Sequence, residues 1–398
     1  MTRNDTQHVP SRGTKASPDA IRQERGRLQY VDNLRITLTA LVVLHHTAIT
    51  YGNFAAWYYA EPSQDGSRQA LGSFVTFNQA FFMGFFFMIA GYFTPLSYER
   101  KGARLFCRDR LKRLGIPLLV FILLIRPMVN FAGFAQLQDR MPYWLYYIVS
   151  WDPGPMWFLE VLLLFAMLYV LIRRCADCRP FALKAGTEIV DGTRRPRDHK
   201  PPRPGAIIAF TAALALATYL WRFIVPTGTY IPFVGLPTPN YLPQYASFFT
   251  LGVLAFRRGW PQTLSRTTGR VGFAVAVLAA LIYAIVTAAA PAGSTFGHDS
   301  SLATAAWEST FAVGLITGLT VFFREHLIRQ GRAAEFLSRH AFAVYLIHPP
   351  VLVALAFAFR WMHAPAAAKF ALVAALALPL CWAVAYAVRS LPRADRLL

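Results

Sequence analysis

The sequence is short of charged residues and of cysteine. Asp, Glu, Lys and Arg make up 15% of its 398 residues, against about 25% in ordinary soluble domains. Its four cysteines are too few for a small secreted domain held together by disulfides. Hydrophobic residues make up 55% of the chain, and many apolar runs approach the roughly 20 residues that cross a bilayer as a helix. A soluble enzyme and a disordered chain are therefore excluded, and an integral membrane protein with many spans remains.

Ten apolar segments predict an all-α, polytopic membrane protein with about ten transmembrane helices. They are residues 35–52, 76–96, 114–132, 156–172, 206–225, 241–256, 271–289, 306–323, 341–359 and 367–388. Acidic residues are half as numerous as basic ones, 20 against 40. With the N-terminus in the cytosol, 34 of the 40 Lys and Arg fall in segments facing that side, as the positive-inside rule requires. The charge predicts that both termini are cytosolic, and no nucleic-acid partner is needed to explain it.

Polar segments flank and interrupt the apolar region. Residues 1–30 have no apolar core and no cleavage site of a signal peptide, and they are predicted to be a disordered basic cytosolic tail. Residues 31–390 are predicted to form the membrane domain, with a loose Pro- and Arg-rich cytosolic linker at 173–205. Residues 391–398 are predicted to be a short cytosolic tail. A lone Cys-x2-Cys pair in the linker has no second pair, so no metal site is predicted.

The first span carries a stripe of ionisable residues, which are costly at membrane depth and therefore candidates for function. Arg35 and His46 are eleven residues apart, which is three helical turns plus about 20° and a rise of about 16 Å. Their side chains therefore share one face, and Asp32 lies within ion-pair reach of Arg35 on the same face. His45 points about 100° away. The alternative interpretation is an arginine that extends to the membrane surface beside a histidine packed in the core.

The stripe and several later stretches resemble the acyltransferase-3 family of bacterial inner-membrane O-acyltransferases, including its glucan succinyltransferase branch. The similar stretches are Asp32-x2-Arg35, Arg35-x10-His46, 78–84 running into 86–93, 108–113 before Pro117, 156–159, Gln244-Tyr245 with Gly252, and 345–348. Ala90 departs from the pattern, because the family often has Ser before the glycine. The resemblance implies a bacterial cytoplasmic-membrane enzyme that moves an acetyl or succinyl group from cytosolic acyl-CoA to a hydroxyl of an extracytoplasmic glycan or glycolipid.

His46 is the predicted catalytic base. A sugar hydroxyl is a poor nucleophile at neutral pH, and a neutral imidazole, with an ordinary pKa of about 6.5, is suited to take its proton. Arg35 and Asp32 are predicted to be catalytic with it. Acyl-CoA would be a co-substrate, with no permanently bound cofactor. Direct transfer and a transient acyl group on His46 both stay open.

Arginines at the cytosolic mouth of the first span are predicted to bind the phosphates of acyl-CoA. Phosphate oxygens match the two-pronged guanidinium group. Arg35 lies at this mouth, and Arg110 and Arg113 share one face if the segment between spans two and three is helical. The alternative is that positive-inside charge alone explains these arginines.

Four further residues complete the candidate site. Glu160 is predicted to orient or charge the His46 ring or to contact the acceptor, unless it pairs with an arginine near the outer side. Trp157 and Tyr345 are candidate sugar platforms, with packing as the alternative. His348 is a candidate substrate contact, although it precedes two prolines and can instead satisfy the helix kink that they cause.

A transporter or a flippase of a lipid-linked glycan is the main alternative function, because ten spans with Pro- and Gly-broken helices suit that class too. A catalytically inactive acyltransferase fold used as a membrane scaffold is a third. The absence of a visible internal repeat argues against the transporter, and the intact Asp32–Arg35–His46 stripe argues against the scaffold. The sequence does not define the acyl group, the acceptor glycan or the oligomeric state.

The charge distribution predicts that residues 53–75 are extracytoplasmic and 173–205 cytosolic. A cysteine placed at Ser67 should react with a membrane-impermeant thiol reagent in intact cells, whereas one at Thr187 should not. The reverse pattern would contradict the orientation.

Overall fold

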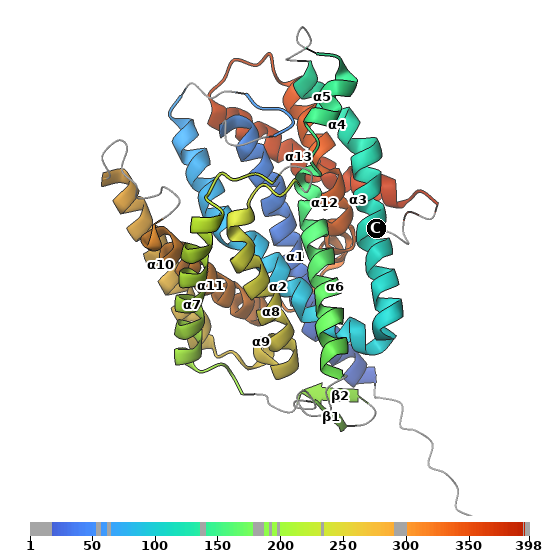
Figure 1. The fold of residues 1–398 in the computed structure, drawn as a ribbon, viewed down its shortest axis with the longest axis vertical. Helices are drawn as coiled ribbons and strands as arrows, with labels where there is room; N and C mark the ends of the chain where they lie inside the picture. The colour runs from blue at the N-terminus through green and yellow to red at the C-terminus, as the bar shows by residue number, and fades with distance from the viewer. Residues whose placement is uncertain are drawn as a thin grey trace, which may run out of the picture.

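Long helices run side by side through most of the molecule in the computed structural model (Figure 1). The structure describes residues 18–52, 57–61, 65–135, 141–177, 187–190, 193–196, 200–231, 235–289, 301–392 and 394. The helices are α1 (Pro18–Gly52), α2 (Ser67–Arg110), α3 (Ile116–Val120), α4 (Arg126–Phe134), α5 (Tyr143–Val149), α6 (Trp157–Asp177), α7 (Pro204–Ile224), α8 (Leu242–Arg258), α9 (Trp260–Thr263), α10 (Arg266–Ala289), α11 (Leu302–His326), α12 (Arg332–Ala358) and α13 (Ala366–Arg389). Each of the ten predicted spans lies in helical structure.

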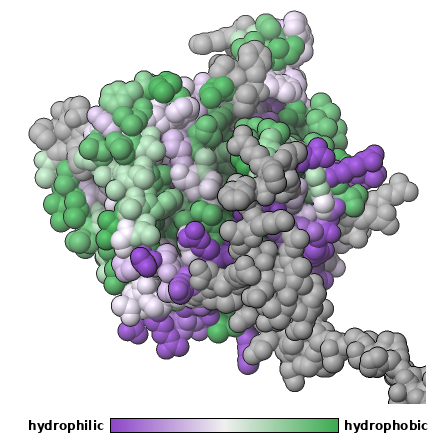
Figure 2. All heavy atoms as spheres, turned by 60° about the horizontal axis from the view of Figure 1, so that its bottom comes forward, coloured by the Kyte–Doolittle hydropathy of each residue, from purple (hydrophilic) through white to green (hydrophobic). Residues whose placement is uncertain are grey.

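Seven helical stretches of the described chain are long and apolar enough to cross a membrane by length and composition. The first of them, Ser67–Phe131, contains two of the predicted spans. The helices α1 and α8 lie in the same bundle (Figure 1). Figure 2 shows hydrophobic side chains on the flanks of the molecule and hydrophilic ones gathered on the face that is turned forward. The protein is a multi-pass membrane protein.

The helical run Ser67–Phe131 is interrupted at Gly102, where the backbone leaves the helical region with φ 70° and ψ 168°. A positive φ is accessible to glycine without a steric penalty, so this residue allows the kink within α2. Beyond it, two π-helical turns, Leu111–Gly115 and Phe121–Ile125, flank α3. Pro117 has no N–H to donate to the carbonyl four residues earlier, so the regular α-helical hydrogen-bond pattern is interrupted there. The basic segment between the predicted spans is therefore helical.

The crossing of α2 and α8 depends on two glycines. A Cβ atom at Gly91 would lie 2.1 Å from the carbonyl oxygen of Phe249, and one at Gly252 would lie 2.1 Å from that of Met88. Both distances are far below van der Waals contact. The two backbones therefore touch, which fixes the position of the helix that carries Gln244 and Tyr245.

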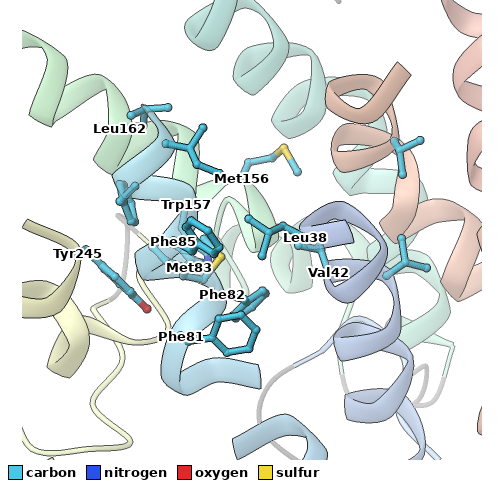
Figure 3. Close-up of a cluster of buried hydrophobic side chains, with 14 of the residues drawn as sticks. Leu38, Val42, Phe81, Phe82, Met83, Phe85, Met156, Trp157, Leu162 and Tyr245 are labelled. Atoms are coloured by element: carbon cyan, nitrogen blue, oxygen red, sulfur yellow. The ribbon is translucent and has the colours of Figure 1, made fainter. Parts of the chain in front are cut away.

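The core between α1, α2 and α6 is built from large apolar side chains (Figure 3). Leu38 and Val42 come from α1, Phe82 and Met83 from α2, and Trp157 from α6, and all five are buried. Leu38 and Val42 are one turn apart, so they form the face of α1 that packs in the core. This packing fixes the rotation of α1 and hence the direction of its polar stripe.

Two predicted polar segments differ from expectation. Helix α1 begins at Pro18, so residues 18–30, predicted to be a disordered tail, are helical; this stretch is rich in Arg, Gln and Glu, which are good helix formers. In the predicted loose linker, β1 (Thr187–Val190) pairs with β2 (Thr193–Pro196) in an antiparallel hairpin. The sequence between these strands is Asp-Gly, a combination typical of two-residue hairpin turns. Residues 1–17 and most of the predicted tail 391–398 lie outside the described residues.

The α2–α8 crossing predicts that Gly252→Ala destabilises the protein. The added methyl group would have to separate two backbones, and overpacking of this kind costs about 1–3 kcal/mol. The apparent melting temperature of the detergent-solubilised protein should fall by several degrees. Gly205→Ala is the control, because a Cβ atom at Gly205 meets nothing within 4 Å. Equal melting temperatures for the two variants would contradict the close approach.

Candidate active site

An arginine-lined cavity opens between α1, α2, α6, α12 and α13. Its volume is about 500 Å³. The polar side chains on its wall are Arg35, Thr39, Arg110, Arg113, Ser338, Tyr345 and Arg389. The three arginines that the sequence singles out as donor ligands therefore share one cavity, although Arg35 lies far from the other two in sequence.

The guanidinium groups are held at this wall by specific partners. Arg35 forms an ion pair with Asp32, with 3.5 Å between Nη1 and Oδ1, which confirms that both residues share one helix face. The Arg35 guanidinium carbon also lies 5.3 Å from the centre of the Phe93 ring, and that of Arg110 lies 5.1 Å from the Phe106 ring. Cation–π contacts hold a guanidinium in place without using all of its N–H groups. Donors are thus left for a ligand.

The remainder of the wall is apolar, and Met83, Phe86 and Phe158 contribute to it. Ala90, the residue that departs from the resemblance, lines the cavity too. A cavity with cations and a long apolar wall suits a ligand that has an anionic head and a slender body.

His46 lies beyond the cavity along α1, where it contacts three other aromatic rings. Its ring centroid is 4.5 Å from that of Trp57, 4.9 Å from that of His348 and 5.4 Å from that of His45. Its Nδ1 lies 2.9 Å from the main-chain oxygen of Val42. A carbonyl can only accept a hydrogen bond, so in the neutral ring the proton is assigned to Nδ1, and Nε2 keeps its lone pair. The main chain therefore orients this ring through the Val42 oxygen.

His348 lies about one turn along α12 from Tyr345, which lines the cavity, and its ring is also hydrogen-bonded to the main chain. Its Nδ1 lies 2.7 Å from the main-chain oxygen of Tyr345. That oxygen would normally accept from the N–H four residues on, but residue 349 is a proline and has none. His348 therefore satisfies the carbonyl that Pro349 leaves free, as the structural interpretation predicted. His348 is also in contact with His46. Its role at the helix kink and a role as a substrate contact are therefore compatible.

His45 occupies a different environment from its neighbour. It is buried, its Nδ1 lies 3.3 Å from the side-chain nitrogen of Asn78, and its ring centroid lies 4.9 Å from that of Phe82. These contacts place His45 in the core against α2, away from the face that carries Arg35 and His46.

Three predicted site residues take positions that the sequence left open. Trp157 is buried and stacks on Tyr245 at 5.4 Å between ring centroids, so it packs in the core (Figure 3). One carboxylate oxygen of Glu160, Oε2, is buried without a hydrogen-bond partner, and none of the ion pairs among the described residues includes Glu160. Tyr345 lines the cavity, and its hydroxyl donates to the carbonyl of Pro155.

Other buried charges are structural. Arg222 pairs with Glu308 at 2.6 Å, and the Tyr241 hydroxyl donates to the second oxygen of the same carboxylate at 2.6 Å. Arg126 is fully buried and donates to the main-chain oxygens of Tyr147 and Ser150. These two arginines therefore have partners other than Glu160.

Sequence reasoning missed two residues of the site. Arg389 joins the cavity from the end of α13, and Trp57 stacks on His46 from the segment after α1. The positive charge at a predicted span end was the only signal for Arg389. No pattern in the sequence predicts that Trp57 packs against α1.

Comparisons with known proteins identify the family of the chain. A family model described as "Acyltransferase domain" matches residues 28–386. The chain belongs to the acyltransferase-3 family. Proteins called glucans biosynthesis protein C from Salmonella schwarzengrund (strain CVM19633), Salmonella heidelberg (strain SL476) and Salmonella typhi are each 24% identical to it over 353 residues, which cover 82% of this chain and 82% of theirs. No solved structure matches the chain.

Membership of this family makes the protein a membrane-bound acyltransferase. The predicted enzyme class is confirmed, and the transporter, the main alternative, is not supported. The matched region spans α1 to α13 apart from their outermost residues. It therefore includes both histidines and every cavity-lining residue except Arg389.

The environments of the two adjacent histidines predict different effects on activity. His46→Ala should lower the rate of acyl transfer by about 10²–10⁴-fold, the usual contribution of a general base, while the protein still accumulates in membranes. His45→Ala should lower the melting temperature through lost packing but keep transfer per folded molecule. Rates with purified variants, normalised to monodisperse protein, check this. Equal retention of activity by both variants would refute the assignment of His46.

Proposed function

We propose that the protein transfers an acyl group from cytosolic acyl-CoA to a hydroxyl of an extracytoplasmic glycan, with His46 as the base. One observation carries the proposal: the cavity that collects Arg35, Arg110 and Arg113 also includes Tyr345, which is one helical turn from His348. His348 in turn contacts His46. The cationic groups suit the phosphate-rich head of a donor. A chain of contacts through Tyr345 and His348 connects their cavity with the imidazole of His46.

The donor would bind head first in the cavity. Coenzyme A carries a diphosphate and a 3′-phosphate, and guanidinium groups form paired, charge-assisted hydrogen bonds with phosphate oxygens. Four arginines line the cavity. The thin pantetheine arm would run along the apolar wall past Phe86 and Phe158, which brings the thioester toward His46.

The chemical step then needs one base. The acceptor hydroxyl gives its proton to Nε2 of His46 while its oxygen attacks the thioester carbonyl. The C–S bond breaks, the thiolate of coenzyme A leaves, and it takes up the proton. An ester and free coenzyme A are the products. Because Nδ1 of His46 is engaged by the Val42 oxygen, the ring presents Nε2 to the substrates. Asp32 would keep Arg35 in position, and Glu160, at the start of α6, would contact the acceptor.

The proposed topology has ten spans and both termini in the cytosol. Five cavity residues come from chain segments that this topology assigns to one side of the membrane: Arg35, Arg110, Arg113, Ser338 and Arg389. Their meeting at one cavity supports the proposed alternation of spans. The donor is a cytosolic metabolite, so this side would be the cytosolic one.

The acceptor is proposed from the relatives. The Salmonella proteins are named for glucan biosynthesis, and a glucan outside the cytoplasmic membrane of a bacterium offers many hydroxyl groups. An acetyl or succinyl group fits the resemblance equally, and the proposal covers both.

The donor assignment predicts that arginines on the cavity wall control acyl-CoA affinity. Arg113→Ala, Arg110→Ala and Arg35→Ala should each weaken binding, because a hydrogen bond to a charged group contributes about 1.5–3 kcal/mol. Arg→Lys at the same positions should restore little, since lysine keeps the charge but loses the paired geometry. Acyl-CoA affinity of the purified protein is the measurement.

Arg108→Ala is the matched control, because Arg108 belongs to the same basic stretch and is exposed but does not line the cavity. It should bind acyl-CoA as the wild type does. If the cavity variants bind like Arg108→Ala, these arginines set topology only and the donor site lies elsewhere.

A further inference from the structure

Trp57 has a buried N–H group without a partner. The indole nitrogens of Trp221, Trp307 and Trp382 each donate to a main-chain oxygen at 2.9–3.1 Å. The Nε1 atom of Trp57 is buried and has no hydrogen-bond partner in the part of the chain that the structure describes. Burying such a donor unbonded costs about 1–3 kcal/mol. An unbonded donor beside a catalytic base therefore calls for a ligand as its partner.

His348 has the complementary unpaired group. The residue is completely buried, and its Nε2 has no partner among the described residues. Because Nδ1 donates to the Tyr345 oxygen, Nε2 carries the lone pair and can only accept. Trp57 thus offers a donor without an acceptor, and His348 offers an acceptor without a donor.

The two unpaired groups flank His46. The ring centroids of Trp57 and His348 are 6.4 Å apart, and they lie 4.5 and 4.9 Å from that of His46. An N–H or a ring lone pair points along the plane of its ring, and these two planes are within 17° of parallel. A single oxygen atom that bonds to both nitrogens, each at about 2.9 Å, therefore lies at the edges of the rings and not between their faces. A hydroxyl group is the partner that fits, because it accepts one hydrogen bond and donates another.

The segment that carries Trp57 is fixed to the bundle at its far end. The Glu61 N–H donates to the Thr50 oxygen at 2.9 Å, and the Glu61 carboxylate forms an ion pair with Lys369 at 2.5 Å. The Tyr59 hydroxyl donates to the same carboxylate at 3.1 Å. These bonds to α1 and α13 hold the indole against His46, as preorganised binding requires.

We propose that Trp57 Nε1–H and His348 Nε2 together bind a second hydroxyl of the acceptor, adjacent to the one that His46 deprotonates. The site thus selects acceptors with two neighbouring hydroxyl groups, as on a sugar ring, over simple alcohols. This inference rests on the proposed function, in which His46 is the base. It adds Trp57 as a substrate-binding residue and gives His348 a defined role.

A series of singly deoxygenated acceptors tests the proposal. The purified full-length protein is supplied with acetyl-CoA or succinyl-CoA and with methyl β-glucoside or each of its monodeoxy derivatives. Ester formation is followed by mass spectrometry. One derivative that keeps the reacting hydroxyl should show kcat/KM at least about tenfold below that of the parent, because the bound hydroxyl is missing.

Trp57→Phe keeps an aromatic ring but removes the indole N–H together with the rest of the five-membered ring. It should lower kcat/KM for the parent glucoside by about tenfold, yet leave the sensitive deoxy derivative at its wild-type value, because that derivative already lacks the bond. If Trp57 has only a structural role, the substitution should lower kcat/KM equally for both acceptors. That result would overturn the proposal. Trp221→Phe, which also loses an indole N–H, should keep the wild-type preference. If Trp57→Phe is not monodisperse, His348→Gln is measured in the same way, with the same expected pattern.

The outcomes separate this inference from the proposed function. Esters formed equally well from the parent and from every derivative that keeps the reacting hydroxyl would contradict the inference alone. That result would also mean that the two nitrogens bind only a structural water. No ester from either donor with any acceptor, the glucans of the host cell included, would contradict the proposed function and the inference with it.

Discussion

Hydrogen bonding within the bilayer must be satisfied by the protein itself, and the rest of this molecule depends on that constraint. It makes the spanning segments helical, and it requires a partner wherever a helix is broken. At Pro349 the freed carbonyl accepts a hydrogen bond from the ring of His348, and the guanidinium of Arg126 donates to two main-chain oxygens at the C-terminal end of α5. The groups around His46 that have no partner among the described residues are therefore informative, because buried polar groups in proteins are generally hydrogen-bonded.

Much of the fold follows from the sequence because hydrophobicity and charge report directly on the bilayer. All ten predicted spans lie in helices, and the face shared by Asp32, Arg35 and His46 follows from helical periodicity alone. The arginine cavity was predicted in part for the same reason, since Arg110 and Arg113 are three residues apart on one helix. Periodicity shows which residues share a face, but it does not show which face of another helix they meet.

The rest could not be predicted, because it depends on contacts between distant segments. Arg389 reaches the cavity only because α13 packs against α12, and Trp57 reaches His46 only because its segment folds back onto the bundle. The position of Trp157 in the core, where the sequence allowed a sugar platform, depends on its stacking with Tyr245 of α8. The hairpin of β1 and β2 had a local signal in the Asp-Gly pair, which the surrounding polar composition obscured.

The two histidines come from opposite ends of the chain, His46 from α1 and His348 from α12. During synthesis the first of them enters the membrane early, whereas the second leaves the ribosome only after most of the protein has been made. Arg389 follows later still. A copy that still lacks α12 and α13 therefore has neither a complete cavity nor a complete ring cluster. The cavity is complete only once α13, which carries Arg389, has been made.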